Sequence, residues 1–110
     1  MMKMLRFYLS NTDTLRHESL YEQIAVAAKD FGLKGATVYS GEMGFGETSR
    51  LRSNKFWELN VKHPVIVEII DDEQRLLDFL DKVRPELDAT QKGFLVTMQD
   101  IEIIYKKQGQ

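Results

Sequence analysis

The strongest restriction on the fold comes from the short run Val65-Ile-Val-Glu-Ile-Ile70, in which every residue except Glu68 is β-branched and apolar. Such residues favour strands, and His63-Pro64 just before the run favours an extended backbone at its start. Alternate residues of a strand point to opposite sides, so both sides of this one carry valine or isoleucine. A strand that is apolar on both sides is usually buried on both sides. The run therefore predicts a central strand with both faces covered.

Further strands are predicted on either side of this run. Residues 4–10 alternate between outward and inward positions, which is typical of a half-buried strand. Residues 36–40 and 94–98 are rich in β-branched and aromatic side chains and are predicted strands as well. Residues 101–106 are predicted to form another strand, or to continue the preceding one after a bend.

A first helix is predicted to begin at Ser19, where Ser19 and Glu22 are spaced as in a capping box. Gly32 stands where a left-handed C-terminal cap favours glycine. Apolar residues recur between these points at the spacing of one helix face. These residues are Leu20, Ile24, Ala27, Ala28 and Phe31.

A second helix is predicted after Asp71 or Asp72, either of which could cap it, and Pro85 is expected to end it close by. Its apolar face is predicted to consist of Leu76, Leu77, Leu80 and Val83, bordered by Phe79. The segment that follows, residues 86–93, is predicted to be a polar turn.

The order strand, helix, strand, strand, helix, strand predicts an α+β, ferredoxin-like βαββαβ sandwich over a single domain, residues 1–110. Its antiparallel sheet would carry two helices on one face. Because two helices cannot also cover the second face, we expect that face to pack in a closed homo-oligomer. Arg6 and Glu68 lie on strands that are neighbours in this fold. They are either an ion pair inside the interface or two independently solvated charges.

A long segment, residues 41–59, joins the second and third predicted strands and follows neither a strand nor a helix period. Long loops in small domains are usually functional or disordered, and we expect residues 45–55 to be mobile in the absence of a ligand or partner. Glycine backbone N–H groups and arginine side chains both suit an anion. The candidate ligand-binding residues in this segment are Gly41, Gly44, Gly46, Arg50 and Arg52.

The same segment holds side chains typical of protein interfaces. The candidate partner-binding residues are Phe45, Lys55, Phe56 and Trp57. Each feature also has a purely structural interpretation. The glycines can serve only loop flexibility, the arginines can be solvated surface charges, and Phe56 and Trp57 can pack on the scaffold or on a neighbouring subunit.

A second candidate anion site lies later in the chain, at Lys92, Gly93 and Lys106. We predict no metal site, because the chain has no cysteine and its histidines, His17 and His63, belong to no spaced ligand set. No nucleophile–base arrangement is visible, so we do not expect an enzyme.

The charge balance bears on the class of partner. A net charge of −2 gives no electrostatic reason to expect nucleic acid. No apolar run approaches the roughly 18 residues of a membrane span, so a membrane protein is not expected. The absence of cysteine fits a cytoplasmic protein.

Four segments together are similar to a known family: Gly35–Gly41, Met43–Gly46, Pro64–Asp71 and Gly93–Ile104. In this order and spacing they resemble the PII-like family called domain of unknown function 190. The resemblance implies a ferredoxin-like fold and a homotrimer, as in PII signalling proteins and the CutA family. It also implies that residues 41–59 correspond to the PII T-loop, which docks onto transporters or enzymes.

PII proteins bind ATP or ADP between subunits, and members of the resembling family are often encoded beside a fluoride exporter. The resemblance therefore implies a regulatory trimer without a required cofactor, with ATP, ADP or AMP as an effector and a membrane transporter or ion exporter as its partner. The chain departs from PII proteins at two places. Where PII proteins have a glycine-rich turn, this chain has Ala89-Thr-Gln-Lys-Gly93, and where they have alternating arginines near the end, it has Tyr105-Lys-Lys107.

Two other functions stay open. A CutA-like trimer that responds to divalent metal ions is the main alternative, and it would use His63. A small enzyme that uses the intersubunit cleft is the other.

Overall fold

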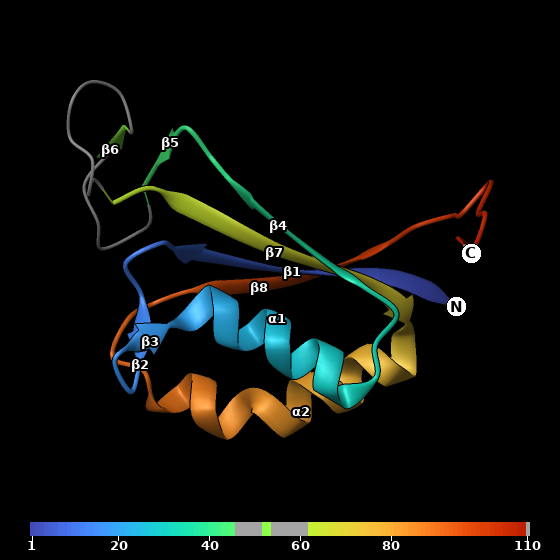
Figure 1. Cartoon of the computed structure of the whole chain (residues 1–110), viewed down its shortest axis with the longest axis horizontal. Helices are drawn as coiled ribbons and strands as arrows, with labels where there is room; N and C mark the ends of the chain where they lie inside the picture. Colours follow the sequence, from blue (N-terminus) through green and yellow to red (C-terminus); the bar gives the residue numbers. More distant parts are fainter. Residues whose placement is uncertain (46–51, 54–61, 110) are drawn as a thin grey trace.

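The structure is a computed structural model that describes residues 1–45, 52–53 and 62–109. In chain order these residues form β1 (Met2–Ser10), β2 (Thr14–Leu15), β3 (Glu18–Ser19), α1 (Leu20–Phe31), β4 (Ala36–Ser40), β5 (Met43–Gly44), β6 (Arg52–Ser53), β7 (Pro64–Asp72), α2 (Glu73–Ala89) and β8 (Leu95–Asp100). Figure 1 shows two layers, with both helices on the same face of the main sheet.

The four long strands form one antiparallel sheet in the order β4-β7-β1-β8. The strand predicted from the apolar run, β7, lies inside this sheet between β4 and β1. The strand order and the two helices on one face are those of the ferredoxin-like fold, so the predicted α+β class is confirmed. Two short ribbons, β2–β3 and β5–β6, stand beside the main sheet.

The core lies between the sheet and the helices. Leu5 and Phe7 of β1 and Val67 and Ile69 of β7 face the helices and are at most 1% exposed. From the helices, Phe79 lies at the centre, with its ring 6.5 Å from the ring of Phe7 in an edge-to-face arrangement. Aromatic pairs in this geometry stabilise a core beyond their buried area.

The apolar face of α2 differs from the predicted one. Phe79, predicted at its border, is fully buried, whereas Leu77, predicted within it, is 38% exposed. The prediction for Leu77 is wrong because α2 is rotated so that Leu76 and Phe79 face the sheet. Leu80 and Val83 pack against the core as predicted.

The end of α2 also differs from the prediction. The helix does not end near Pro85 but continues through it to Ala89. Pro85 lies on the exposed side of the helix, where water can solvate the carbonyl that loses its N–H donor. Leu87, two residues later, is buried in the core and anchors the last turn. Tertiary packing thus outweighs the local preference of proline.

The predicted C-terminal cap of α1 is confirmed, whereas the predicted N-terminal capping box is not. Gly32 is in the left-handed conformation at φ 93° and caps the helix as predicted. Ser19 precedes the first helical residue, but its side chain makes no capping hydrogen bond, so the predicted capping box with Glu22 is wrong. Instead, the carbonyl of Asp13 accepts the N–H of Leu20 at 2.9 Å.

The end of the chain makes no strand. Residues 101–109 follow β8 without regular structure, so the strand predicted at 101–106 is wrong for the single chain. Asp100, the last residue of β8, pairs with Lys3 near the start of β1, so within the described part of the chain the tail runs past the end of its neighbouring strand. Figure 1 shows the tail leaving the body of the molecule beyond the N-terminus.

Candidate functional site

The base of the long segment 41–59 is packed against Pro64. A Cβ added to Gly41 would lie 3.2 Å from the Cβ of Pro64, and one added to Gly44 would lie 3.1 Å from its Cγ. Gly41 also donates its N–H to the carbonyl of Pro64 at 2.8 Å. Both glycines therefore have a structural role, and in this conformation the Gly41 N–H is already bonded rather than open to an anion.

Beyond this base the segment forms a short antiparallel ribbon, in which Gly44 faces Arg52. Phe45 follows directly and is 73% exposed, as an interface residue would be. The other predicted residues of this segment lie outside the described residues, together with most of the range 45–55. They are Gly46, Arg50, Lys55, Phe56 and Trp57.

The second predicted anion-binding turn, Lys92-Gly93, lies between α2 and β8 and is exposed. A Cβ added to Gly93 would meet no atom within 4 Å, so the backbone there is open to a ligand. Lys106 is also exposed, but it follows Asp100, which pairs with Lys3 at the opposite end of the sheet. The structure thus separates Lys106 from this turn within one chain.

The strand order determines how far apart the turns at Gly41 and Gly93 lie in one chain. The end of β4 that leads into Gly41 and the start of β8 that follows Gly93 lie at the same end of the sheet, through the pairs Ser40–Val65 and Tyr8–Leu95. The two strands are opposite edges of the sheet. Three strand spacings, roughly 14 Å, separate them. Within a single chain the two turns do not converge on one anion.

The sheet face away from the helices carries a polar cluster. The Nε of Arg6 donates to Oε2 of Glu68 at 2.9 Å, and the hydroxyl of Tyr39 donates to the same oxygen at 3.1 Å. The hydrogen bond to Glu68 raises the pKa of Arg6. Burial and the bond to Glu68 raise the pKa of Tyr39. At neutral pH Arg6 is therefore charged and Tyr39 is a neutral phenol.

The ion pair between Arg6 and Glu68, one of two alternatives open from the sequence, is confirmed, since the register between β1 and β7 sets these residues opposite each other. That the pair lies inside a subunit interface stays a prediction. Tyr39 was missed. The signal that could have found it is its position in β4, because Tyr39 pairs with Ile66 and therefore shares the open face with Glu68.

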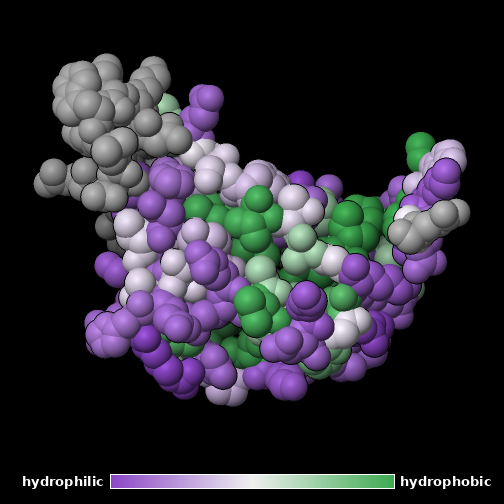
Figure 2. Space-filling view, viewed as in Figure 1, coloured by the Kyte–Doolittle hydropathy of each residue, from purple (hydrophilic) through white to green (hydrophobic). Residues whose placement is uncertain are grey.

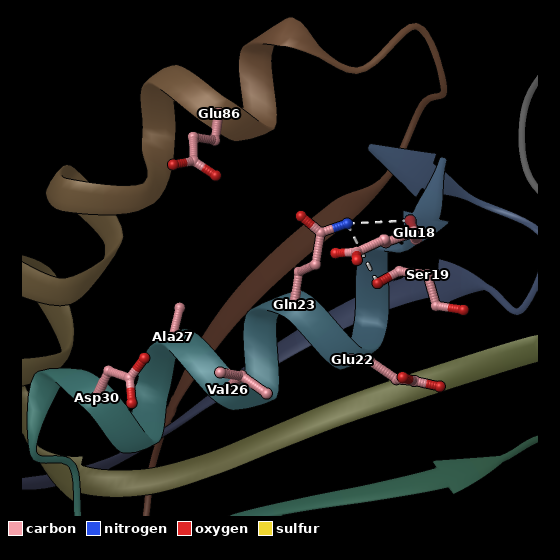
Figure 3. Close-up of a pocket in the computed structure, with 8 residues that line it drawn as sticks. All are labelled: Glu18, Ser19, Glu22, Gln23, Val26, Ala27, Asp30 and Glu86. Atoms are coloured by element: carbon pink, nitrogen blue, oxygen red, sulfur yellow. Dashed lines mark hydrogen bonds between the residues drawn. The ribbon is translucent and has the colours of Figure 1, made fainter. Parts of the chain in front are cut away.

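A groove of about 560 Å³ lies on the other side of the molecule, along α1 (Figure 3). Its lining includes none of the predicted site residues. Four of its lining residues are acidic, namely Glu18, Glu22, Asp30 and Glu86. Gln23, which points into it, donates to the carbonyls of Leu15 and Glu18 and so closes the β2–β3 ribbon onto α1. This negative lining does not suit a phosphate or carboxylate ligand.

Two further observations concern metals and membranes. Within residues 1–45, 52–53 and 62–109, no group of three or more histidine, aspartate or glutamate side chains is arranged to hold a metal ion. None of the described helices is long and apolar enough to cross a membrane.

Comparison with known proteins identifies a matching family and similar proteins. The family model DUF190, "Uncharacterized ACR", matches residues 2–103. A UPF0166 protein of Aquifex aeolicus (strain VF5) is 34% identical over 103 residues, which cover 94% of this chain and 93% of the relative. A UPF0166 protein of Methanocaldococcus jannaschii is 36% identical over 81 residues, which cover 74% of each chain.

Solved structures share the fold. CPII, a nitrogen regulatory PII-like protein from Thiomonas intermedia K12 bound to ADP, AMP and bicarbonate, superimposes with a TM-score of 0.65 at 17% identity and covers 96% of both chains. A protein from Thermus thermophilus described as PII-like and signalling has a TM-score of 0.61 at 17% identity, over 89% of this chain and 84% of that one. The chain therefore belongs to the DUF190 family, and its fold is that of PII-like proteins.

Proposed function

We propose that this chain is a PII-like signalling protein that binds an adenine nucleotide between the subunits of a homotrimer. The observation that carries the proposal is the similarity of fold over nearly the whole chain to CPII, which was crystallised with ADP and AMP. The proposal assigns a binding role rather than a catalytic one, in the cytoplasm, and ATP, ADP or AMP would act as effector.

The strand order supports a site shared between subunits. The backbone around Gly41 and Gly44 and the open turn at Lys92-Gly93 lie at one end of the sheet but on opposite edges. A ligand that uses both turns must therefore take each from a different copy. A cyclic assembly brings the β4 edge of one copy next to the β8 edge of another, and a trimer is the form proposed here.

The sheet face with the Arg6–Glu68 pair supports the same assembly. Around this pair lie apolar side chains that one chain leaves exposed, with Leu95 60% and Ile70 36% accessible. A sheet face of this kind, covered by nothing in the described chain, is buried in the proposed trimer. The tyrosine–glutamate–arginine cluster would then be enclosed with its hydrogen bonds already made.

The long segment 41–59 is proposed to report the ligand to a partner, with a membrane transporter or ion exporter as the class of partner. The exposed Phe45 beside the base of this segment supports a contact role. In the proposed mechanism, a nucleotide that touches the base around Gly44 shifts the conformation of the segment and thereby the affinity for the partner.

Nucleotide binding is tested by calorimetry and thermal melting with ATP, ADP and AMP. A nucleotide at 100 times its dissociation constant should stabilise the protein by about 2.7 kcal/mol. Lys92→Glu should abolish the shift because it reverses the charge at the open turn. Lys29→Glu, which makes the same change on α1, should keep it. No heat and no melting shift with any of the three nucleotides would refute the nucleotide proposal.

A further inference from the structure

The hydroxyl of Thr90 connects three segments at the end of α2. Thr90 follows the last residue of this helix, and its N–H donates to the carbonyl of Leu87 at 3.2 Å. Its hydroxyl oxygen accepts the N–H of Lys92 at 3.5 Å and donates to the carbonyl of Thr14, in β2, at 3.3 Å. One side chain thus links the Lys92-Gly93 turn both to α2 and to the β2–β3 ribbon, which Figure 1 shows beside this end of the helix.

The β2–β3 ribbon is a firm support for this contact. Leu15, the residue after Thr14, is 8% exposed and packs in the core. Asp13, the residue before Thr14, is 2% exposed, and its carboxylate accepts the N–H of Ser10 at 3.0 Å. The side-chain amide of Gln23 donates to the carbonyl of Leu15 at 2.8 Å and so holds the ribbon to α1. The carbonyl of Thr14 therefore lies between two anchored residues.

The other contacts between the ribbon and the end of α2 are weaker. The Nη1 of Arg16 lies 3.7 Å from Oε2 of Glu86, but the two side chains are 72% and 57% exposed, and exposed ion pairs contribute little. Figure 2 shows mainly hydrophilic side chains over this corner, at the lower left of the face turned to the reader. Of the described contacts, those of the Thr90 hydroxyl are therefore the ones that fix the turn to the ribbon.

This arrangement leaves the donors of the turn available to a ligand. The Lys92 side chain is exposed and forms no ion pair within the described part of the chain. Among the described residues, no backbone hydrogen bond outside the helices and strands uses the N–H of Gly93. An ammonium group and a backbone N–H both suit a phosphate oxygen. A turn that is already held in one conformation loses less entropy on binding, so its affinity for the ligand is higher.

We propose that Thr90 is a positioning residue for nucleotide binding, which holds the Lys92-Gly93 turn against the β2–β3 ribbon in the conformation that meets the phosphates. This inference rests on the proposed function, in which that turn contacts the nucleotide. The hydroxyl acts through the turn, because its proton is already donated to the carbonyl of Thr14 and is not available to a phosphate oxygen. The ribbon, which contains none of the site residues predicted from the sequence, thereby has a role in binding.

Thr90→Val tests the hydroxyl, because it removes both hydrogen bonds and keeps the branched shape of the side chain. The dissociation constant for ADP, measured by calorimetry at a temperature where every variant is folded, should rise about tenfold. Thr90→Ser keeps the hydroxyl and should bind ADP within about twofold of the wild type. The matched control is Thr14→Val, whose side chain has no hydrogen bond within the described part of the chain and whose carbonyl stays in place. It should bind like the wild type.

A second variant tests the support that the ribbon gives. Gln23→Ala removes the bond that holds the ribbon to α1, so it should weaken ADP binding about threefold. Its control is Glu22→Ala, the neighbouring exposed residue of α1, which should bind like the wild type. When Gln23→Ala is combined with Thr90→Val, the loss should stay that of Thr90→Val alone, because changes within one hydrogen-bond network are not additive. Losses that multiply would contradict the route through the ribbon.

The wild-type titration separates this proposal from the proposed function. A wild type that binds none of ATP, ADP and AMP refutes the nucleotide proposal, and the role of Thr90 with it. A wild type that binds ADP, with an equal affinity in Thr90→Val, overturns only the role of Thr90. Urea denaturation of the same variants completes the test, since a lower stability of Thr90→Val with unchanged ADP affinity would show that the hydroxyl serves the fold alone.

Discussion

The carboxylate of Asp71, at the end of β7, is fully buried and holds two connections together. One of its oxygens accepts the N–H of Lys34 at 2.9 Å and the other accepts the N–H of Asp72 at 2.7 Å. The Nε of Arg75 lies 3.3 Å from the carboxylate. Burial alone would raise the pKa of Asp71, but the two N–H donors and the Arg75 guanidinium outweigh it and hold this pKa below its usual value.

Asp71→Asn should destabilise the fold by about 2 kcal/mol, because it weakens charge-assisted hydrogen bonds to a buried group. Urea denaturation measures the change. The matched control is Asp72→Asn, since the Asp72 carboxylate is half exposed and pairs only with the N-terminal ammonium among its described contacts. That variant should change stability by less than about 0.5 kcal/mol. Equal losses in the two variants would contradict the assigned role of Asp71.

The lowered pKa of Asp71 also sets a pH dependence. Its contribution is fully present above the pKa of an unfolded aspartate, about 3.9, and is lost as the pH falls through the lower pKa of the folded state. The stability difference between the wild type and Asp71→Asn should therefore be constant from about pH 7 to 5 and shrink toward about pH 2.5. Denaturation curves across this range measure the stability difference. A difference that grows on acidification would show that the pKa of Asp71 is raised rather than lowered by folding.

Among the elements, the β2–β3 ribbon contains a strained turn. Arg16 and His17 connect its strands with φ of 54° and 68°, a left-handed conformation that costs ordinary residues roughly 1–2 kcal/mol each. Turns that need two positive φ angles favour Asn-Gly. His17→Gly should therefore raise stability by about 0.5–1 kcal/mol, measured by thermal melting. Lys29→Gly, the same kind of change inside α1, should lower it by a similar amount. A destabilised His17→Gly would show that the imidazole makes a contact worth more than the strain.

At the scale of the whole molecule, the proposed trimer depends on burial of the sheet face opposite the helices. Leu95 and Ile70 lie on this face by their register with Tyr8 and Met4 of β1. Leu95→Asp and Ile70→Asp should shift the protein from the trimer mass to the monomer mass in size-exclusion chromatography with light scattering, because each buries a charge without a partner. Val26→Asp, on the helical side, should not. Unchanged masses in both sheet variants would place the interface elsewhere.

Local periodicity was enough to predict most of the elements and, through their order, the fold. The alternation around Phe7, the apolar run before Ile70 and the helical recurrence from Leu20 to Phe31 are patterns that a single stretch of chain carries, whatever packs on it. The left-handed position at Gly32 is likewise a local requirement. For these features the spacing of side chains is sufficient, because each element exposes one face to a core.

Features that depend on distant residues required the three-dimensional structure. Leu87 in the core keeps α2 intact through Pro85, and the register of β1 with β7 joins Arg6 to Glu68. Sequence spacing placed Gly41 and Gly93 in loops, but only the strand order shows that they end on opposite edges of the sheet. Local patterns determine which segments become strands and helices, whereas the contacts between them depend on register and packing that no single segment encodes.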